Sequence, residues 1–231
     1  MAKLMWDKSG ERFYETGTKM GVLYVMNNGV YSKGVAWNGL SAVTESPSGA
    51  EENAIYADDI KYLALRSAEE FGATIEAYTY PPEWEECDGS VNLNGLSIGQ
   101  QKRKPFGFTF RTIIGNDEAL DDYGYKLHLV YNATAAPSER AYQSVNDSPE
   151  AVTFSWEIST TPVALTSKDA DGKLYRPTAH LVIDSTKANK TKLEELESRL
   201  YGTDADATTN TEGTDPTLPS PDEVIALFKT V

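Results

Sequence analysis

The chain has 231 residues, with 21 Lys and Arg against 35 Asp and Glu, so its net charge is −14 at neutral pH. This charge repels polyanions and argues against binding of nucleic acid through its phosphates. Cys87 is the only cysteine, which excludes an internal disulfide framework and favours folding in a reducing compartment. The N-terminal segment has no apolar signal-peptide region and no stretch approaches the length of a membrane span, so we expect neither export by a signal peptide nor membrane insertion.

Residues 56–80 contain the first predicted strands. The part that reads YADDIKYLALRSAEEFG is ambiguous, because its apolar residues also fit helical spacing after a cap at Asp58 or Asp59. We favour a strand that leads into a second strand over 69–80, where apolar and polar residues alternate. The apolar set is Phe71, Ala73, Ile75 and Ala77, and the polar set is Gly72, Thr74, Glu76 and Tyr78.

Further stretches show the same period of two, which is typical of strands with one buried face. The apolar sets are Phe106, Phe108 and Phe110; Tyr125, Leu127, Leu129 and Tyr131; and Ala179, Leu181 and Ile183. Turn sequences rich in Gly, Asn and Asp separate these stretches, so hairpins are the simplest connections. The sequence therefore predicts a mainly β fold.

The strictest alternation lies in EAVTFSWEISTTPV, residues 150–163. One face is wholly apolar and consists of Val152, Phe154, Trp156 and Ile158. The other face carries Thr153, Ser155, Glu157 and Ser159. It has no His, Cys or basic group from which a catalytic or metal site could be built.

A helix is predicted between Ser185, which can cap it, and Gly202, which can stop it. Leu193, Leu196 and Leu200 lie at helical spacing within it, so the helix should lie against the sheet. Residues 202–219 contain almost no large apolar side chain and predict a mobile polar linker. The β domain would thus span residues 1–201.

The last segment, SPDEVIALF, predicts a second helix. Ser220 can cap it, Pro221 takes the first helical position and Glu223 completes a capping box. Its apolar residues Val224, Leu227 and Phe228 give this helix a face to bury. Residues 220–231 are therefore expected to form a docking helix or arm on the subunit or on a neighbour.

No catalytic arrangement is predicted. Adjacent carboxylates occur at Asp58 and Asp59, Glu69 and Glu70, Glu85 and Glu86, and Asp121 and Asp122. Neighbours on a strand point to opposite faces, so such pairs do not by themselves place two carboxyl groups about a sugar. No G-x-S-x-G motif is present, and neither histidine, His128 or His180, lies at a short ligand spacing from Cys87 or an acid. We therefore expect no enzyme activity, no cofactor and no metal.

The one basic cluster is Lys102, Arg103 and Lys104, which precedes the three alternating phenylalanines. Aromatic residues beside basic ones are found in platforms for single-stranded nucleic acid. These phenylalanines share one face and are better explained as core. The cluster could instead contact an acidic surface of a neighbouring copy.

Several stretches of the sequence resemble the major tail proteins of long, non-contractile phage tails. They are WDKSGERFYETGTKMGVLY, GVAWNGLSAV, YADDIKYL, EEFGATIEAYTYPPEWEECDG, IGQQKRKPFGFTFRTIIGND, VTFSWEISTTPV and LPSPDEVIALF. The resemblance spans nearly the whole chain in order, and residues 202–219 match least well. It rests on general sequence similarity and not on a catalytic signature.

Proteins of that family fold as a β-sandwich or barrel with a flanking helix, form sixfold rings and stack these rings into the tail tube. The resemblance implies a homo-oligomer in the virion, assembled in the bacterial host cytoplasm, with tape-measure and tail-tip or terminator proteins as partners. In the family each subunit gives about four strands to a sheet around the lumen. Twenty-four strands at ~4.8 Å spacing and ~40° tilt make a barrel roughly 48 Å across, and side chains would leave roughly 40 Å for a duplex about 20 Å wide.

The resemblance gives the polar face of residues 153–159 a candidate role. If the apolar face packs inward, Thr153, Ser155, Glu157 and Ser159 could line the lumen together with Thr74 and Glu76. Hydroxyls and carboxylates give DNA nothing to bind, so DNA would pass without specific binding, whereas rows of Lys would hold it. The alternatives are that this face meets bulk solvent or a neighbouring subunit.

We therefore expect a structural protein whose activity is self-assembly into stacked hexameric rings that conduct DNA. The candidate contacts between subunits are Lys102, Arg103, Lys104, Val224, Leu227 and Phe228. One alternative is a carbohydrate-binding or carbohydrate-active β-sandwich that uses Trp84 and nearby acids. Another is a tail terminator or connector, which forms a ring and does not polymerise.

Overall fold

The structure is a computed structural model that describes residues 3–144, 147, 151–205 and 212–229. Within these ranges, nine strands form one antiparallel sheet, which confirms the prediction of a mainly β, sandwich-like fold. They are β1 (Phe13–Asn27), β2 (Val30–Tyr31), β3 (Val35–Trp37), β4 (Leu40–Glu45), β9 (Gly72–Ala77), β12 (Phe106–Asn116), β13 (Leu120–Ala135), β14 (Phe154–Thr160) and β15 (His180–Asp184).

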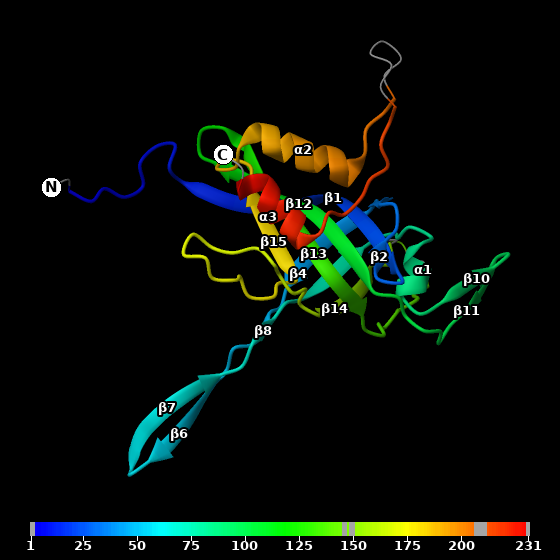
Figure 1. The fold of residues 1–231 in the computed structure, drawn as a ribbon. Coiled ribbons are helices and arrows are strands. Elements are labelled where there is room, and N and C mark those ends of the chain that lie inside the picture. Colours follow the sequence, from blue (N-terminus) through cyan, green and yellow to red (C-terminus); the bar gives the residue numbers. More distant parts are fainter. Residues whose placement is uncertain (1–2, 145–146, 148–150, 206–211, 230–231) are drawn as a thin grey trace.

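The strands follow the order β2–β1–β12–β13–β14–β9–β4, with β15 beside β13 and β3 beside β1 (Figure 1). We call β1, β12, β13 and β15 the first half of the sheet, and β14, β9 and β4 the second half. The sheet curls so that its two halves face each other. Trp37 of β3 therefore packs edge-on against Trp156 of β14, with ring centroids 5.6 Å apart. The described strands do not close into a barrel.

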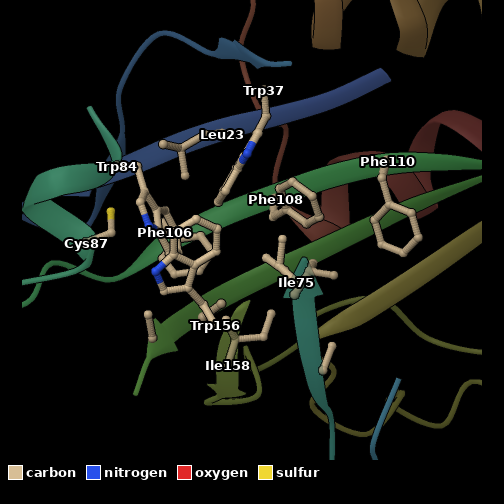
Figure 2. Close-up of a cluster of buried hydrophobic side chains, with 14 of the residues drawn as sticks. Leu23, Trp37, Ile75, Trp84, Cys87, Phe106, Phe108, Phe110, Trp156 and Ile158 are labelled. Carbon is tan, nitrogen blue, oxygen red and sulfur yellow. The ribbon is translucent and has the colours of Figure 1, made fainter. Parts of the chain in front are cut away.

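A first buried cluster fills the space between the two halves (Figure 2). The first half contributes Leu23, Phe106, Phe108 and Phe110, the second half contributes Ile75, Trp156 and Ile158, and the short helix α1 (Trp84–Cys87) adds Trp84 and Cys87. Trp156 and Ile158 are buried while Glu157 and Ser159 are exposed, so the predicted alternation in this strand is confirmed. The same holds for Ala73, Ile75 and Ala77 in β9.

Helices α2 (Lys190–Tyr201) and α3 (Pro221–Lys229) lie over the outer face of the first half, as Figure 1 shows. A second buried cluster lies between these helices and the sheet. Strands β12 and β13 are consequently buried on both faces around Phe108 and Leu129, where alternation predicted one polar face. Gly107 shows how closely the layers approach, because a Cβ there would lie 2.2 Å from Leu218 Cδ2. Any larger residue would push this layer away from the sheet.

The start of α2 differs from the prediction. Asn189 caps the helix by accepting a hydrogen bond from the Lys192 N–H, and Ser185 does not. The Ser185 hydroxyl instead accepts from the Tyr125 N–H at 2.9 Å, which fixes the end of β15 to β13. The predicted stop is confirmed, because Gly202 takes a positive φ of 74° at the end of the helix.

The capping box of α3 is present as predicted. The Glu223 carboxylate accepts from the Ser220 N–H at 2.8 Å, and the Ser220 hydroxyl accepts from the Glu223 N–H at 3.4 Å. Within the segment 202–219, the described ends are anchored: Thr203 pairs with Thr214, and Leu218 is buried. Residues 206–211 of the predicted linker and residues 230–231 of the predicted C-terminal docking segment lie outside the described residues.

Among the described residues, three small two-stranded sheets lie outside the main sheet. The longest is the hairpin of β6 (Glu52–Ala57) and β7 (Ile60–Arg66), which projects from the body in Figure 1. At its base, β5 (Ser48–Gly49) pairs with β8 (Glu69–Glu70). The third is the hairpin of β10 (Val91–Leu93) and β11 (Leu96–Ile98). No helix in the described part of the chain is both long and apolar enough to cross a membrane.

Candidate assembly surfaces

The first candidate surface is the polar face of the second half of the sheet. Strands β14 and β9 pair so that Ser155 lies opposite Glu76 and Glu157 opposite Thr74, and β4 places Thr44 opposite Thr74. Ser159 continues this face along β14, and Thr153 is exposed just before the strand begins. The fold thus gathers the polar residues that the sequence singled out on the side of the second half that faces away from the first cluster.

This polar face is acidic. Glu157 and Glu76 occupy diagonal positions of the β14–β9 pair, which places them roughly 7–8 Å apart in an antiparallel ladder. Strands β14, β9 and β4 contain no Lys or Arg. These three strands would therefore present hydroxyls and carboxylates, and no Lys or Arg of their own, to a polyanion that passed over this face.

The second candidate surface is the projecting hairpin β6–β7, which we call the arm. The structure confirms strand and not helix in this segment, because β6 ends at Ala57 and β7 begins at Ile60. Asp58 and Asp59 make the turn with φ of 51° and 62°, a left-handed conformation that Asp adopts more readily than most residues. This adjacent acid pair therefore forms a hairpin turn and does not cap a helix.

The arm projects from the body (Figure 1) and exposes apolar side chains on the described structure. Its exposed apolar side chains are Ile55, Tyr56, Ile60, Tyr62, Leu63 and Leu65, and Ile60 and Tyr62 are 63% and 67% exposed. Ion pairs from Glu52 to Lys61 and Arg66 link the two strands. A two-stranded hairpin is only marginally stable in water, so this arm is expected to gain its stability from a partner.

Two further segments expose apolar residues. The β10–β11 hairpin turns at Asn94 and Gly95 and exposes Val91, Leu93, Leu96 and Ile98. The N-terminal segment, which extends away from the body in Figure 1, exposes Leu4, Met5 and Trp6. Exposed apolar surface concentrated on projecting segments is typical of contact regions between proteins.

The basic cluster is largely engaged within the subunit. Arg103 pairs with Asp88 at 3.2 Å, and Lys104 pairs with Glu86 at 2.6 Å and with the Asn27 amide at 2.7 Å. These contacts fasten the segment before β12 to the region of α1. Lys102 is exposed and remains the member of the cluster best placed for an outside contact.

The C-terminal helix docks on its own subunit. Val224 is buried in the second cluster, and Leu227 and Phe228 are partly buried against it. Asp222 accepts hydrogen bonds from the backbone of Thr166 and Ser167 at 2.8 and 2.9 Å, and these bonds hold the pKa of Asp222 below its usual range. Val224 is therefore covered by its own subunit. Leu227 and Phe228 keep part of their side-chain surface exposed, so they have more surface with which to contact a neighbour.

Trp84 does not offer a sugar-stacking surface. Its ring is 0% exposed and packs against Trp37, Phe106 and Trp156 with centroids 4.6 to 5.2 Å apart. A sugar ring can stack only on an aromatic face that it can reach. The neighbouring acids Glu85 and Glu86 lie on α1, and Glu86 is already paired with Lys104. The carbohydrate alternative therefore loses the residue on which it rested.

The two histidines come together with a carboxylate that sequence spacing did not connect to them. His128 of β13 and His180 of β15 stack at 5.4 Å between ring centroids, and Glu45 at the end of β4 lies beside both. Burial lowers the pKa of each imidazole to about 4, so both are neutral at neutral pH. Burial also raises the pKa of Glu45. The sequence did not predict this cluster, because it depends on the register between strands and not on the spacing of residues along the chain.

Comparison with known proteins assigns no family to this chain. No protein-family model matches the sequence, and no curated protein matches it. One similar solved structure is a chain of the anti-feeding prophage baseplate, with 9% identity, a TM-score of 0.36 and coverage of 80% of this chain and 99% of that one. Another belongs to the sheath–tube complex of the extracellular contractile injection system PVC, with 12% identity, a TM-score of 0.30 and coverage of 78% and 93%. At these TM-scores the overlap carries no argument about function.

Proposed function

We propose that this protein is a structural, non-enzymatic virion subunit that assembles into hexameric rings, which stack into the tail tube of a long, non-contractile phage tail. The observation that carries the proposal is the arm, which exposes six large apolar side chains on a hairpin that projects from the described body (Figure 1). A monomer would gain nothing from such a hairpin. A repeating assembly would bury it once in every subunit.

The proposal assigns the arm to contacts with a neighbouring copy. The apolar side chains of Ile60 and Tyr62 lie on one face of β7, and Ile55 and Leu63 are paired across the hairpin. Such a hairpin can lie against a groove or add strands to an open sheet edge. The N-terminal segment and the β10–β11 hairpin would provide further contacts, since they too expose apolar residues. Lys102 would pair with the acidic surface of a neighbour.

The proposal places the polar face toward the lumen. The helices cover the outer side of the first half, whereas the polar face is the outer side of the second half, so the two lie on opposite sides of the first cluster. If α2 and α3 face the outside of a ring, then Glu157, Glu76 and their neighbouring hydroxyls face the inside. A lumen without Lys or Arg would let DNA pass, because DNA would not exchange its counterions for protein cations.

The partners follow from this role. We propose that the tube encloses the tape-measure protein during assembly and meets tail-tip and terminator proteins at its ends. The resemblance of the sequence to major tail proteins supports this part of the proposal.

Electron microscopy of the purified protein after concentration tests the proposal, with light scattering to measure the mass in solution. We expect rings of six subunits and tubes built from them. Rings that never stack would favour the terminator or connector instead. A protein that stays monomeric at high concentration and in virion extracts would contradict both.

A further inference from the structure

Glu45, His128 and His180 come from three different strands and point their ligand atoms at one another. Their closest atoms are His128 Nδ1 and His180 Nε2 at 3.3 Å, His128 Nδ1 and Glu45 Oε1 at 3.4 Å, and His180 Nε2 and Glu45 Oε1 at 3.8 Å. All three lie within 4.8 Å of one another. Strand pairing explains the approach of the histidines, since the β13–β15 register places them diagonally on one face.

These separations match a tetrahedral metal site. Ligands at ~2.0–2.1 Å from Zn²⁺ with tetrahedral angles lie about 3.3 to 3.4 Å apart. The two separations from His128 Nδ1 fall at this value. The separation between His180 Nε2 and Glu45 Oε1 is longer. Glu45 is the one exposed member, with 43% of its side chain accessible, so a small movement of this carboxylate would complete the geometry.

The hydrogen bonds around the histidines leave suitable lone pairs. His128 Nε2 lies 3.1 Å from Thr112 Oγ1. In the tautomer in which this nitrogen donates to the hydroxyl, His128 Nδ1 turns a lone pair toward Glu45 and His180. One proton on His180 Nε2 can then satisfy only one of the two acceptors that face it. A divalent cation would satisfy all three groups at once.

The rings are also held in place. Phe110 stacks on His128 with centroids 4.4 Å apart, and Phe71 packs on His180 at 4.2 Å. A ligand that is fixed before binding loses little conformational freedom when the ion arrives.

We propose that Glu45, His128 and His180 bind one divalent transition-metal ion, with Zn²⁺ as the ion that fits best, and that a water molecule completes its coordination. Two imidazoles and one carboxylate are a donor set that zinc and iron(II) both accept in proteins. The position of the site between strands of the two halves of the sheet supports a structural role. The ion would join the end of β4 in the second half of the sheet to β13 and β15 in the first half.

The site lies at the base of the arm. Glu45 is the last residue of β4, the Ser46 N–H donates to Gly72 O at 2.8 Å, and the chain between them forms the arm and its base. Phe71, which packs on His180, begins the return into β9. A bound ion would therefore hold both ends of this projecting segment and restrict the direction of the arm.

The experiment uses the purified full-length protein and Zn²⁺ as the probe. We measure Zn²⁺ affinity by competition with a chromophoric chelator in wild type, Glu45→Gln and His180→Ala. The matched control is Glu69→Gln, which removes an exposed carboxylate at the base of the arm but outside the site. Because the Glu45 side chain is 43% accessible, whereas that of His180 is 15% accessible, Glu45→Gln should fold even if His180→Ala does not.

We expect one Zn²⁺ per wild-type subunit, with affinity at least ~10-fold weaker in Glu45→Gln and unchanged in Glu69→Gln, since even groups that only orient a ligand contribute 10–100-fold. Zinc should also slow hydrogen exchange at the Ser46 amide in wild type. Absence of stoichiometric binding, or equal affinity in wild type and Glu45→Gln, would overturn the proposal. Neither result depends on ring or tube formation, so the assembly proposal is tested separately.

Discussion

At the scale of single residues, Trp156 packs between the two halves of the sheet and stabilises their contact. Its ring is fully buried and contacts Trp37, Tyr80, Trp84 and Phe154. Trp156→Ala should therefore lower the free energy of unfolding by ~3–5 kcal/mol, the range for removal of a large buried aromatic. Thr153→Ala, at an exposed position three residues earlier, should change it by less than ~0.5 kcal/mol. Urea unfolding measures both, and equal stability of the two variants would show that the faces are wrongly assigned.

Glu157 tests the proposed lumen by charge. Glu157→Lys places a cation on an exposed position of a face without Lys or Arg, so it creates no cavity and should leave folding and tube formation intact. Repeated in every subunit, it should slow genome ejection at low salt, and added salt should relieve the effect.

The matched control for that variant is Glu194→Lys. It makes the same charge change at an exposed position of α2, on the side of the body that the proposal turns outward. We expect normal ejection from a phage with this change. A Glu157→Lys phage that ejects normally at low salt would remove the lumen assignment and leave the tube assignment in place.

At the scale of elements, the arm is the part of the fold that a monomer does not need. Ile60→Ser combined with Tyr62→Ser removes two exposed apolar side chains from one face of β7. The melting temperature of the subunit should stay close to that of wild type, whereas assembly should be lost or require much higher concentration. Leu174→Ser, which changes a side chain 54% exposed on another surface, is the control. Sedimentation velocity compares the three proteins, and unchanged assembly of the double variant would exclude the arm as a contact.

The C-terminal helix acts through its own subunit. Deletion of residues 220–231 removes Val224 from the second cluster together with the hydrogen bonds of Asp222 to Thr166 and Ser167. The truncated subunit should melt at a lower temperature and assemble less well, because the groove beneath the helix becomes exposed. Val224→Asp should show the same loss in milder form. Normal tubes from the truncated protein, seen by electron microscopy, would contradict this account of the helix.

Local sequence patterns predicted the secondary-structure elements better than they predicted how these elements pack together. Alternation at residues 152–158 and the capping box at Ser220 are properties of neighbouring residues, and both are present in the structure. The cap of α2 was wrong because the Ser185 hydroxyl bonds a strand 60 residues away. Two-sided burial of β12 and β13 was missed because the helices that cover them come later in the chain.

The candidate surfaces show the same difference between what a local pattern predicts and what depends on tertiary packing. The polar face of Ser155 and Glu157 follows from a period of two, so the sequence predicted which residues share it. The arm was predicted only as strand, since its projection depends on the lack of contacts with the body. The approach of Glu45 to His128 and His180 depends on the register of β13 with β15 and on the curl that brings β4 near them.

At the scale of the whole molecule, the features combine into one arrangement. Helices cover one side of the curled sheet, and the arm projects from the body (Figure 1). A polar acidic face covers the opposite side of the sheet, and the arm exposes apolar side chains. In a ring, the first side would face outward, the second would line the lumen and the arms would reach neighbouring subunits. A net charge of −14 per subunit fits a conduit that DNA crosses without binding.

Electron cryomicroscopy of the assembled protein tests this arrangement most directly, because one map shows the symmetry, the contacts and the lining of the lumen together. The account predicts rings of six subunits stacked into a hollow tube, with Glu157 and Glu76 facing the lumen, α2 on the outside and the arm of each subunit buried against a neighbour. A tube with Glu157 on its outer wall, or with the arm of each subunit left in solvent, would contradict it.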